Sequence, residues 1–336
     1  MKDPKFQHEY MMDNAGFKGV YKEGLDFGAW QESARGKLGE LLGMDTFEKC
    51  DDNIDIEWKY EDKEKIEYRF TFNTEKNFRA AAHLLIPKAA QQPVPVMICL
   101  QGHSKGMHIS LGRPKYPGDE VSISGGDRDF AVQCIKEGYA AFVLEQRGFG
   151  ECGGDENGPQ CYQPSAAALL LGRTLIGERV WDVSRSIDLM QKHFPQVDPA
   201  RIGIMGNSGG GTTTIYAAAM DTRIAAAMPS CAFCGYKESI GVQRHCFCNY
   251  VPGIMRWFDM GDLAGLIAPR PLVVVNGRKD EIFPIASAKA QFAIARALYD
   301  VAGASEKCVH AVGSEGHRFY AALGWPIFNE LTGWKK

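Results

Sequence analysis

Beyond residue 93, short apolar runs alternate with longer segments in which apolar residues recur at helical spacing. Strands covered by helices on both faces have this appearance in parallel βαβ units. We therefore expect one α/β domain over 1–336, with a mostly parallel central sheet and helices on both faces. The predicted strands cover 94–100, 140–145, 202–205, 225–229, 271–276 and 307–312, and the predicted helices cover 127–137, 178–193, 210–221, 286–301 and 319–331.

The N-terminal part, 1–90, follows a different pattern. An amphipathic segment at 30–42 predicts a helix. Apolar and polar residues then alternate with a period of two over 54–60 and 66–72, and a third strand is expected at 78–86. Such alternation is typical of antiparallel strands with one wet face, so we expect these strands at one edge of the sheet.

Two segments interrupt the strand–helix alternation. Residues 151–172 are rich in Gly, Pro and Cys, and 230–268 are far longer than an ordinary connection between a strand and a helix. Both should leave the sheet at the carboxyl ends of strands, where open α/β sheets bind ligands. We interpret 230–268 as a lid-like insertion over a substrate cleft, unless both segments only cover the surface. The aromatic side chains expected to form the walls of the cleft are Phe247, Tyr250, Trp257 and Phe258.

The overall charge excludes few classes of function, but it favours a small-molecule partner. Charged residues make up 24% of the chain and the net charge is −3, which gives no electrostatic reason to expect nucleic acid or an anionic membrane. No run approaches the roughly 18 apolar residues of a membrane-spanning helix. The first ten residues lack the apolar core of a signal peptide. We therefore expect a cytoplasmic protein without membrane or nucleic-acid partners, and the sequence leaves open whether it forms a homo-oligomer.

Ten cysteines raise the question of their chemical state. Cys231 and Cys234 have the spacing of a zinc-binding pair, but Cys246 and Cys248, which follow His245, are separated by a single residue. Aromatic neighbours indicate an apolar environment in which free thiols behave as small hydrophobic groups. The sequence favours buried thiols over metal ligands or disulfides, and we expect no metal and no cofactor.

The sequence Gly206-Asn207-Ser208-Gly209-Gly210 directly follows a predicted strand and precedes a helix of small residues. A G-x-S-x-G motif in this context makes a tight turn that presents the serine at the end of the strand, the nucleophile elbow. Gly102-His103-Ser104-Lys105-Gly106 also fits the pattern, but Gly- and Pro-rich sequence follows it instead of a helix. Ser208 is therefore the predicted nucleophile.

A serine hydroxyl needs an adjacent base, and that base needs an orienting acid. With a nucleophile elbow, the acid follows a later strand and the histidine comes near the C-terminus. Asp280, after the run at 271–276, is the predicted acid, and His317, after the run at 307–312, is the predicted base. The alternatives are Glu281, Asp259 and Asp262 for the acid, and His310, His245 and His193 for the base.

An oxyanion formed at the substrate carbonyl needs two backbone N–H donors. One comes from the residue after the nucleophile, which is Gly209, and the other from the loop after the first parallel strand. The turn Gln101-Gly102-His103 occupies that loop, so the N–H of His103 is the predicted second donor.

With these residues placed, the chain from about residue 80 onwards resembles the α/β-hydrolase superfamily. The resemblance is to the branch of acetyl xylan esterases, cephalosporin deacetylases and dienelactone-hydrolase-like proteins. A serine at the elbow, where dienelactone hydrolases have cysteine, argues against that last activity. The motifs that support the resemblance are Gln101-Gly102-His103, Arg147-Gly148-Phe149-Gly150, the elbow at 206–210, the helix sequence from Gly172-Arg173 to Trp181-Asp182, and the turns with Asp280 and His317.

The predicted mechanism and the resemblance together imply a serine hydrolase that cleaves small acyl esters, acetyl esters of carbohydrates among them, through an acyl-enzyme. A serine peptidase on the same fold would use the same three residues. A non-catalytic binding protein would not need them.

Overall fold

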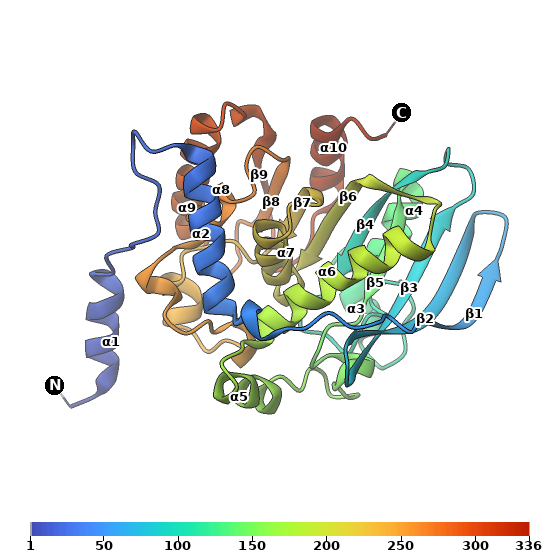
Figure 1. Ribbon diagram of the computed structural model, residues 1–336, viewed down its shortest axis with the longest axis horizontal. Helices are drawn as coiled ribbons and strands as arrows, with labels where there is room; N and C mark the ends of the chain where they lie inside the picture. Colours follow the sequence, from blue (N-terminus) through green and yellow to red (C-terminus); the bar gives the residue numbers. More distant parts are fainter. Residues whose placement is uncertain (1, 336) are drawn as a thin grey trace.

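The computed structural model describes residues 2–335, whose nine strands form one sheet in the order β1-β2-β3-β5-β4-β6-β7-β8-β9 (Figure 1). β3 pairs antiparallel with β2 and β5, β1 pairs antiparallel with β2, and the remaining pairs are parallel. The predicted α/β-hydrolase fold, with antiparallel strands at one edge, is thus confirmed. The strands are β1 (Asp55–Glu61), β2 (Lys65–Glu75), β3 (Phe78–Pro87), β4 (Val94–Leu100), β5 (Ala140–Leu144), β6 (Val197–Asn207), β7 (Ile224–Ser230), β8 (Leu272–Gly277) and β9 (Cys308–Gly313).

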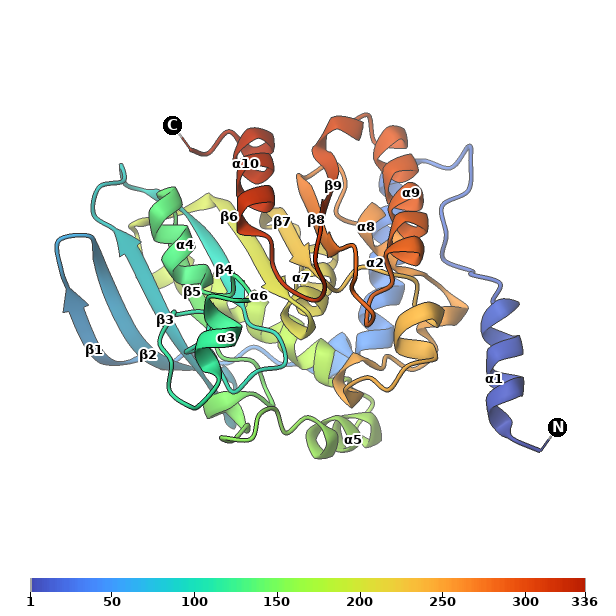
Figure 2. The same cartoon turned by 180° about the vertical axis from the view of Figure 1, so that it is seen from behind.

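Helices cover both faces of the sheet, as the apolar runs require. Figure 1 shows α2, α6 and α7 in front of the sheet, and Figure 2, from behind, shows α4 and α10 in front of it. The helices are α1 (Pro4–Asp13), α2 (Phe27–Leu42), α3 (Asp119–Ile123), α4 (Phe130–Glu137), α5 (Tyr162–Leu170), α6 (Leu175–His193), α7 (Gly209–Met220), α8 (Met260–Gly265), α9 (Ile285–Val301) and α10 (Ala321–Thr332).

Strand β4 illustrates why the central strands have continuous apolar sequences. Val96 and Ile98 pack in the same apolar cluster as residues of α6 and α7, whereas Met97 and Cys99 pack with residues of α4 and α10. Successive side chains of a strand point to opposite faces, and here both faces are buried. Every residue of β4 is consequently buried.

The two segments that interrupted the predicted alternation contain short helices. Helix α5 lies within 151–172, and α8 ends the long connection between β7 and β8. Between β7 and α8 the chain forms three short helical turns, Lys237–Gly241, Phe247–Asn249 and Ile254–Arg256.

Helix α1 has no buried residue, and Figure 1 shows it projecting from the rest of the chain. The side chains of Asp13, at its end, and Lys237 form an ion pair. Within residues 2–335, no helix is both long and apolar enough to cross a membrane.

Candidate active site

Ser208 occupies the sharp turn between β6 and α7. Its backbone has φ 54° and ψ −121°, a strained conformation for a residue with a side chain. A Cβ on Gly206 would lie 2.5 Å from the Gly210 carbonyl group, and a Cβ on Gly210 would lie 2.1 Å from the Leu100 carbonyl oxygen. Only glycine therefore fits on either side of the bend, which is the reason for the G-x-S-x-G spacing.

Asp280 and His317 form a hydrogen-bonded pair at the carboxyl ends of β8 and β9. The distance from His317 Nδ1 to Asp280 Oδ2 is 2.8 Å, and the Asp280 side chain is fully buried. The other carboxylate oxygen accepts hydrogen bonds from the N–H groups of Ile282 and Phe283. Burial opposes ionisation of Asp280, but the hydrogen bond and charge of His317 outweigh it and lower the pKa of Asp280. Asp280 can therefore fix the orientation and tautomer of the imidazole.

The hydroxyl of Ser230, at the end of β7, links the elbow to the histidine loop. It accepts a hydrogen bond from the Asn207 side chain at 3.3 Å and donates one to the Arg318 carbonyl at 3.4 Å. The Ser230 carbonyl also accepts from the N–H of Ser208 at 2.8 Å. The immediate neighbours of Ser208 and His317 are thus joined through a single buried side chain.

Cys231 lies beside the acid–base pair, a position that the sequence did not indicate. One ligand-type atom from each of Cys231, Asp280 and His317 lies within 4.8 Å of the others. Burial, followed by the Asp280 charge, raises the pKa of Cys231 to about 12, so the thiol stays neutral. It donates to the Arg318 carbonyl at 3.2 Å and thereby supports the loop that presents His317. Cys231 directly follows β7 and has φ 46°, but nothing in the local sequence indicated this role.

The turn after β4 packs directly against the elbow. A Cβ on Gly102 would lie 2.8 Å from the Asn207 carbonyl oxygen and 3.1 Å from the Ser208 Cβ, so this glycine allows the close approach. Within residues 2–335 the backbone N–H of His103 has no hydrogen-bond partner. The imidazole of His103 lies over Gly209, where an added Cβ would be 2.6 Å from the ring.

Glu145, immediately after β5, forms hydrogen bonds with this turn. One of its carboxylate oxygens accepts from the Gln101 side chain, and the other accepts from the Met107 N–H at 3.0 Å. Burial, which outweighs these hydrogen bonds, raises the pKa of Glu145 to about 7. The sequence places Glu145 only at the end of a predicted strand, because nothing local shows which loop it contacts.

The contacts of Arg147 and Gly148 show what the Arg-Gly motif does in the fold. Its buried guanidinium forms two 2.8 Å hydrogen bonds with Asp182 on α6 and an ion pair with Glu75 at 2.7 Å. Gly148, at φ 81°, then lets the chain pass the Cys161 thiol. The motif anchors the connection after β5 to α6 rather than contributing to the Asp280–His317 pair.

The alternative acids and bases lie in other environments. His310 bonds with Asn276 at 3.0 Å, His193 with Asp52 at 3.0 Å, and His245 with Ser239 at 3.0 Å. Asp259 and Asp262 form the capping box of α8, and Glu281 is exposed. Among the predicted acids and bases (Asp280, Glu281, Asp259 and Asp262; His317, His310, His245 and His193), the only acid–base hydrogen bond within residues 2–335 joins Asp280 and His317.

The four predicted substrate-wall residues separate into two pairs. Phe247 and Tyr250 lie side by side with ring centroids 5.8 Å apart, and Phe247 also stacks on Tyr162 of α5. Trp257 packs under the Lys37 ammonium group, and Phe258 is 1% exposed, with its ring against Gly19. Trp257 and Phe258 thus pack against the N-terminal segment.

The ten cysteines are free thiols in the structure. Cys246 and Cys248, weighed as metal ligands together with Cys231 and Cys234, instead gather with Cys161 and His103. Hydrogen bonding with the Cys161 and Cys246 thiols, together with the charge of Arg179, outweighs burial and lowers the pKa of Cys248 well below its usual value. The four-residue group adjoins the predicted oxyanion turn.

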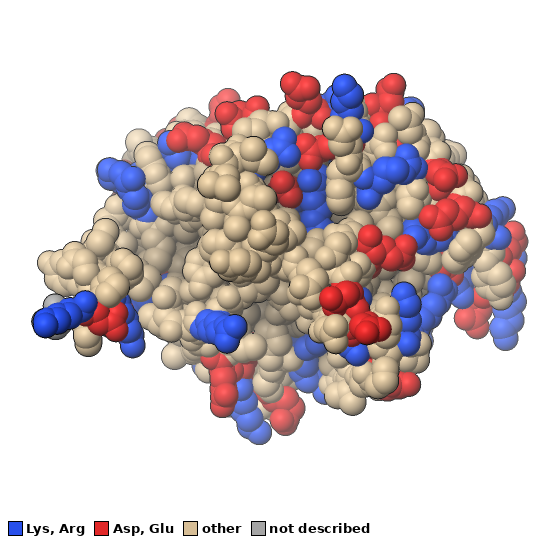
Figure 3. All heavy atoms as spheres, turned by 90° about the horizontal axis from the view of Figure 1, so that it is seen from below, with Lys and Arg blue, Asp and Glu red and all other residues tan. Residues whose placement is uncertain are grey.

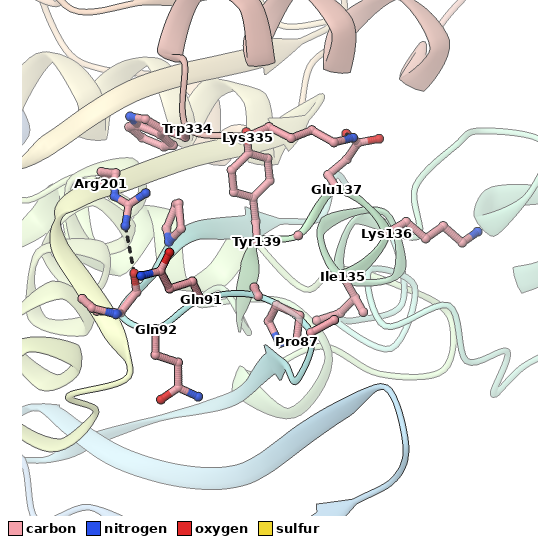
Figure 4. Close-up of a pocket in the computed structure, with 15 residues that line it drawn as sticks. Pro87, Gln91, Gln92, Ile135, Lys136, Glu137, Tyr139, Arg201, Trp334 and Lys335 are labelled. Carbon is pink, nitrogen blue, oxygen red and sulfur yellow. Dashed lines mark hydrogen bonds and ion pairs between the residues drawn. The ribbon is translucent and has the colours of Figure 1, made fainter.

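The cavities are distributed unevenly around the sheet. One of about 500 Å³ lies near the amino ends of β4 and β6, where Arg201 donates a 2.8 Å hydrogen bond to the Pro93 carbonyl (Figure 4). A smaller cavity of about 240 Å³ lies beside the oxyanion turn and is lined in part by His103, Lys105 and Asn157. The larger cavity is at the opposite end of the strands from Ser208.

The face that carries α5 is shown in Figure 3, where uncharged atoms fill much of the middle and charged groups are more frequent towards the edges. Apolar side chains of the α5 region are exposed on it, with Tyr162 at 73% and Leu170 at 90%. Because Tyr162 stacks on Phe247, α5 and the β7–β8 connection meet on this side of the molecule.

This combination of a mostly parallel sheet, a strained serine after β6 and a buried aspartate bonded to a histidine after β8 and β9 defines the class of α/β-hydrolases. The model of the Abhydrolase family matches residues 11–310, and the chain therefore belongs to this family.

Comparisons with individual proteins agree with this fold. The chain is 29% identical over 252 residues to YtaP of Bacillus subtilis, whose name assigns it to the hydrolases, and the match spans 73% of this chain and 80% of YtaP. A Bacteroides fragilis structure assigned as an acetyl xylan esterase superposes with a TM-score of 0.77 at 17% identity, over 98% of this chain and 90% of the other. A glucuronoyl esterase from Solibacter usitatus gives a TM-score of 0.70 at 16% identity, over 94% and 96% of the two chains.

Proposed function

We propose that this protein is a serine esterase that hydrolyses small acyl esters of carbohydrates through an acyl-enzyme. The observation that supports the proposal most directly is the 2.8 Å hydrogen bond between His317 and the buried Asp280, on loops joined by Ser230 to the strained elbow at Ser208.

In the first step, His317 Nε2 takes the proton of the Ser208 hydroxyl while the oxygen attacks the ester carbonyl carbon. Asp280 stabilises the imidazolium that forms and keeps its Nδ1–H directed away from the serine. The imidazolium then gives its proton to the departing alcohol, which leaves Ser208 acylated. A water molecule activated by His317 releases the acid and restores the serine.

Negative charge develops on the carbonyl oxygen during both steps, and we assign the N–H groups of Gly209 and His103 as the donors that stabilise it. The unpaired His103 N–H and the close packing of Gly102 on Ser208 support this assignment. One oxyanion donor contributes about 3–4 kcal/mol to transition-state stabilisation in such enzymes.

The substrate proposal rests on the relatives and on the aromatic side chains near α5. Acetyl xylan and glucuronoyl esterases, which share this fold, act on esters of carbohydrates by name. Phe247 and Tyr250 form an adjacent aromatic pair, which suits a sugar ring and an aliphatic chain equally.

Replacing Ser208 with Ala tests the nucleophile. We expect hydrolysis of p-nitrophenyl acetate to fall by about 10⁵- to 10⁶-fold, to the background rate, because removing the nucleophile of a triad has effects of that size. Ser104→Ala, which alters the second G-x-S-x-G motif, should change the rate less than tenfold. A Ser208→Ala variant with the activity of the wild type would contradict the proposal.

A substrate panel tests the specificity. Acetylated xylo-oligosaccharides, a methyl ester of glucuronic acid, longer p-nitrophenyl acyl esters and peptide p-nitroanilides should be compared by kcat/KM. We expect the acetylated saccharides to be preferred. A preference for the p-nitroanilides would indicate a peptidase, and a preference for long acyl chains would exclude the carbohydrate ester proposal. Labelling by a fluorophosphonate would separate either enzyme from a non-catalytic binding protein.

A further inference from the structure

Three long connections meet beside the oxyanion turn, and each contributes sulfur or nitrogen atoms to one cluster. His103 follows β4, Cys161 precedes α5, and Cys246 and Cys248 flank Phe247 in the β7–β8 connection. The distance from His103 Nε2 to Cys248 Sγ is 3.1 Å, and that from Cys248 Sγ to Cys246 Sγ is 3.3 Å. All four atoms lie within 4.8 Å of one another.

These separations are within a few tenths of an ångström of those around a tetrahedral ion. With Zn–S bonds of about 2.3 Å and Zn–N bonds of about 2.0–2.1 Å, neighbouring ligand atoms are about 3.5–3.8 Å apart. A disulfide needs sulfur atoms about 2.0 Å apart, so two sulfurs would have to move towards each other and away from the other ligands. Three thiols and one imidazole are also a common ligand set of structural zinc sites.

Arg179 supplies an independent electrostatic argument. Its guanidinium is 1% exposed, and within residues 2–335 it makes no ion pair with a carboxylate. It donates to the Arg147 carbonyl and, at 3.3 Å, to the Cys161 sulfur, and its Nη1 has no partner. A buried cation of this kind requires a nearby anion. Three thiolates around a divalent ion carry one net negative charge, which Arg179 would balance.

We propose that His103, Cys161, Cys246 and Cys248 bind one Zn²⁺ ion in a structural site. Four protein ligands close the coordination sphere, so the site has no open position for a catalytic water. Binding requires the thiols to lose their protons, and no change of oxidation state is involved. The proposal replaces the expectation of buried free thiols for Cys246 and Cys248, and it adds two ligands that the sequence spacing did not indicate.

The consequence for the active site rests on the proposed function. The His103 ring lies between the cluster and Gly209, and its edge contacts Phe149 with ring centroids 5.2 Å apart. An ion bound at Nε2 would fix the ring and, through it, the backbone N–H that we assign to the oxyanion. Metal loss should therefore lower kcat without removing Ser208, Asp280 or His317 from their places.

The test is the metal content of the full-length protein, produced with zinc in the medium and purified without chelators or a histidine tag. We expect about one zinc per chain by mass spectrometry, as for a closed four-ligand site. Cys246→Ser and Cys161→Ser should lose most of the metal. Cys308→Ser, a change of another buried thiol away from the cluster, should retain it and shows that the effect is not a general one of losing a cysteine.

Cobalt substitution provides a second measurement that does not depend on enzymatic activity. The Co²⁺-loaded wild type should show thiolate charge-transfer and tetrahedral d–d bands, and Ser208→Ala should show them equally. Metal binding by Ser208→Ala with loss of hydrolysis separates this proposal from the proposed function. Wild type without zinc and without cobalt bands would overturn it. So would two fewer titratable thiols in unreduced, denatured wild type than the ten in the sequence, because they would indicate a disulfide.

Discussion

The two ends of the central sheet differ in the volume of their cavities and in the side chains that they carry. At the amino ends of the strands lies the larger cavity, about 500 Å³, lined by surface groups such as Gln92, Lys136 and Lys335 (Figure 4). At the carboxyl ends two smaller cavities, of about 280 and 240 Å³, lie beside the oxyanion turn. That end, however, has the strained Ser208 and the buried Asp280, which is bonded to His317.

Burial and strain therefore identify the functional end better than cavity volume does. A buried carboxylate costs free energy unless hydrogen bonds compensate it, and a non-glycine residue at positive φ costs about 1–3 kcal/mol. Such features persist only where the surrounding structure enforces them. Single substitutions at the carboxyl end and at the amino end of the sheet test this difference.

After Ser208→Ala, Asp280→Asn should have the largest effect on kcat. The amide would favour the wrong tautomer of His317, and the corresponding change in a serine protease lowers kcat by about 10⁴-fold. The measurement is kcat for p-nitrophenyl acetate. Glu281→Gln, a change of the adjacent exposed carboxylate, is the matched control and should have kcat close to that of the wild type. Equal losses in both variants would contradict the assignment of Asp280.

Gly209→Ala should rank next. The new Cβ would lie 2.6 Å from the His103 ring, so the ring and the oxyanion turn must shift. We expect kcat to fall by about 10²- to 10³-fold, the effect of losing one oxyanion donor. Gly36→Ala is the control, because a Cβ there meets nothing within 4 Å. It should leave kcat unchanged and stabilise α2 by about 0.5–1 kcal/mol. Wild-type kcat in Gly209→Ala would show that the turn does not depend on this contact.

Glu145→Gln should change the pH dependence of stability. The pKa of Glu145 is about 7 in the folded protein and 4.5 for an ordinary glutamate, so folding takes up a proton between these values. Stability should therefore fall as the pH rises from about 4.5 to about 7, by about 3 kcal/mol for this group. Glutamine does not ionise, and its amide can donate to the unpaired Gln101 Oε1.

Urea denaturation at several pH values measures this effect. The free energy of unfolding of Glu145→Gln minus that of the wild type should increase as the pH rises from 4.5 to 8, because only the wild type loses stability over this range. The exposed Glu156→Gln should give a difference that hardly changes with pH. A constant difference for Glu145→Gln as well would exclude a raised pKa.

Arg201→Ala, at the amino end, should have the smallest effect on activity. It removes the hydrogen bond to the Pro93 carbonyl and the ion pair with Asp198 and opens the larger cavity further. We expect a loss of about 1 kcal/mol in stability, typical of such contacts, and kcat/KM within about twofold of the wild type. A fall in kcat/KM comparable to that of Gly209→Ala would show that the amino end takes part in the reaction.

Local sequence was sufficient for most of the sheet and for the elbow. Period-two alternation and apolar runs predicted all nine strands, because strand exposure is set by which faces are covered. The glycines around Ser208 predicted the turn, since no larger residue fits there. The short helix α5 was not predicted, because its sequence lies in a Gly- and Pro-rich stretch and its helix is only 9 residues long.

The sequence alone did not determine which loops contact one another. Cys161 and His103 are 58 positions apart along the chain, and Cys248 is more distant still, so only the folded sheet brings their atoms within 4.8 Å. The same applies to Glu145 under the oxyanion turn and to Trp257 and Phe258 against the N-terminal segment. Side-chain period and turn chemistry are local properties, whereas contacts between loops depend on the order in which the strands pair, and that order is fixed only by tertiary packing.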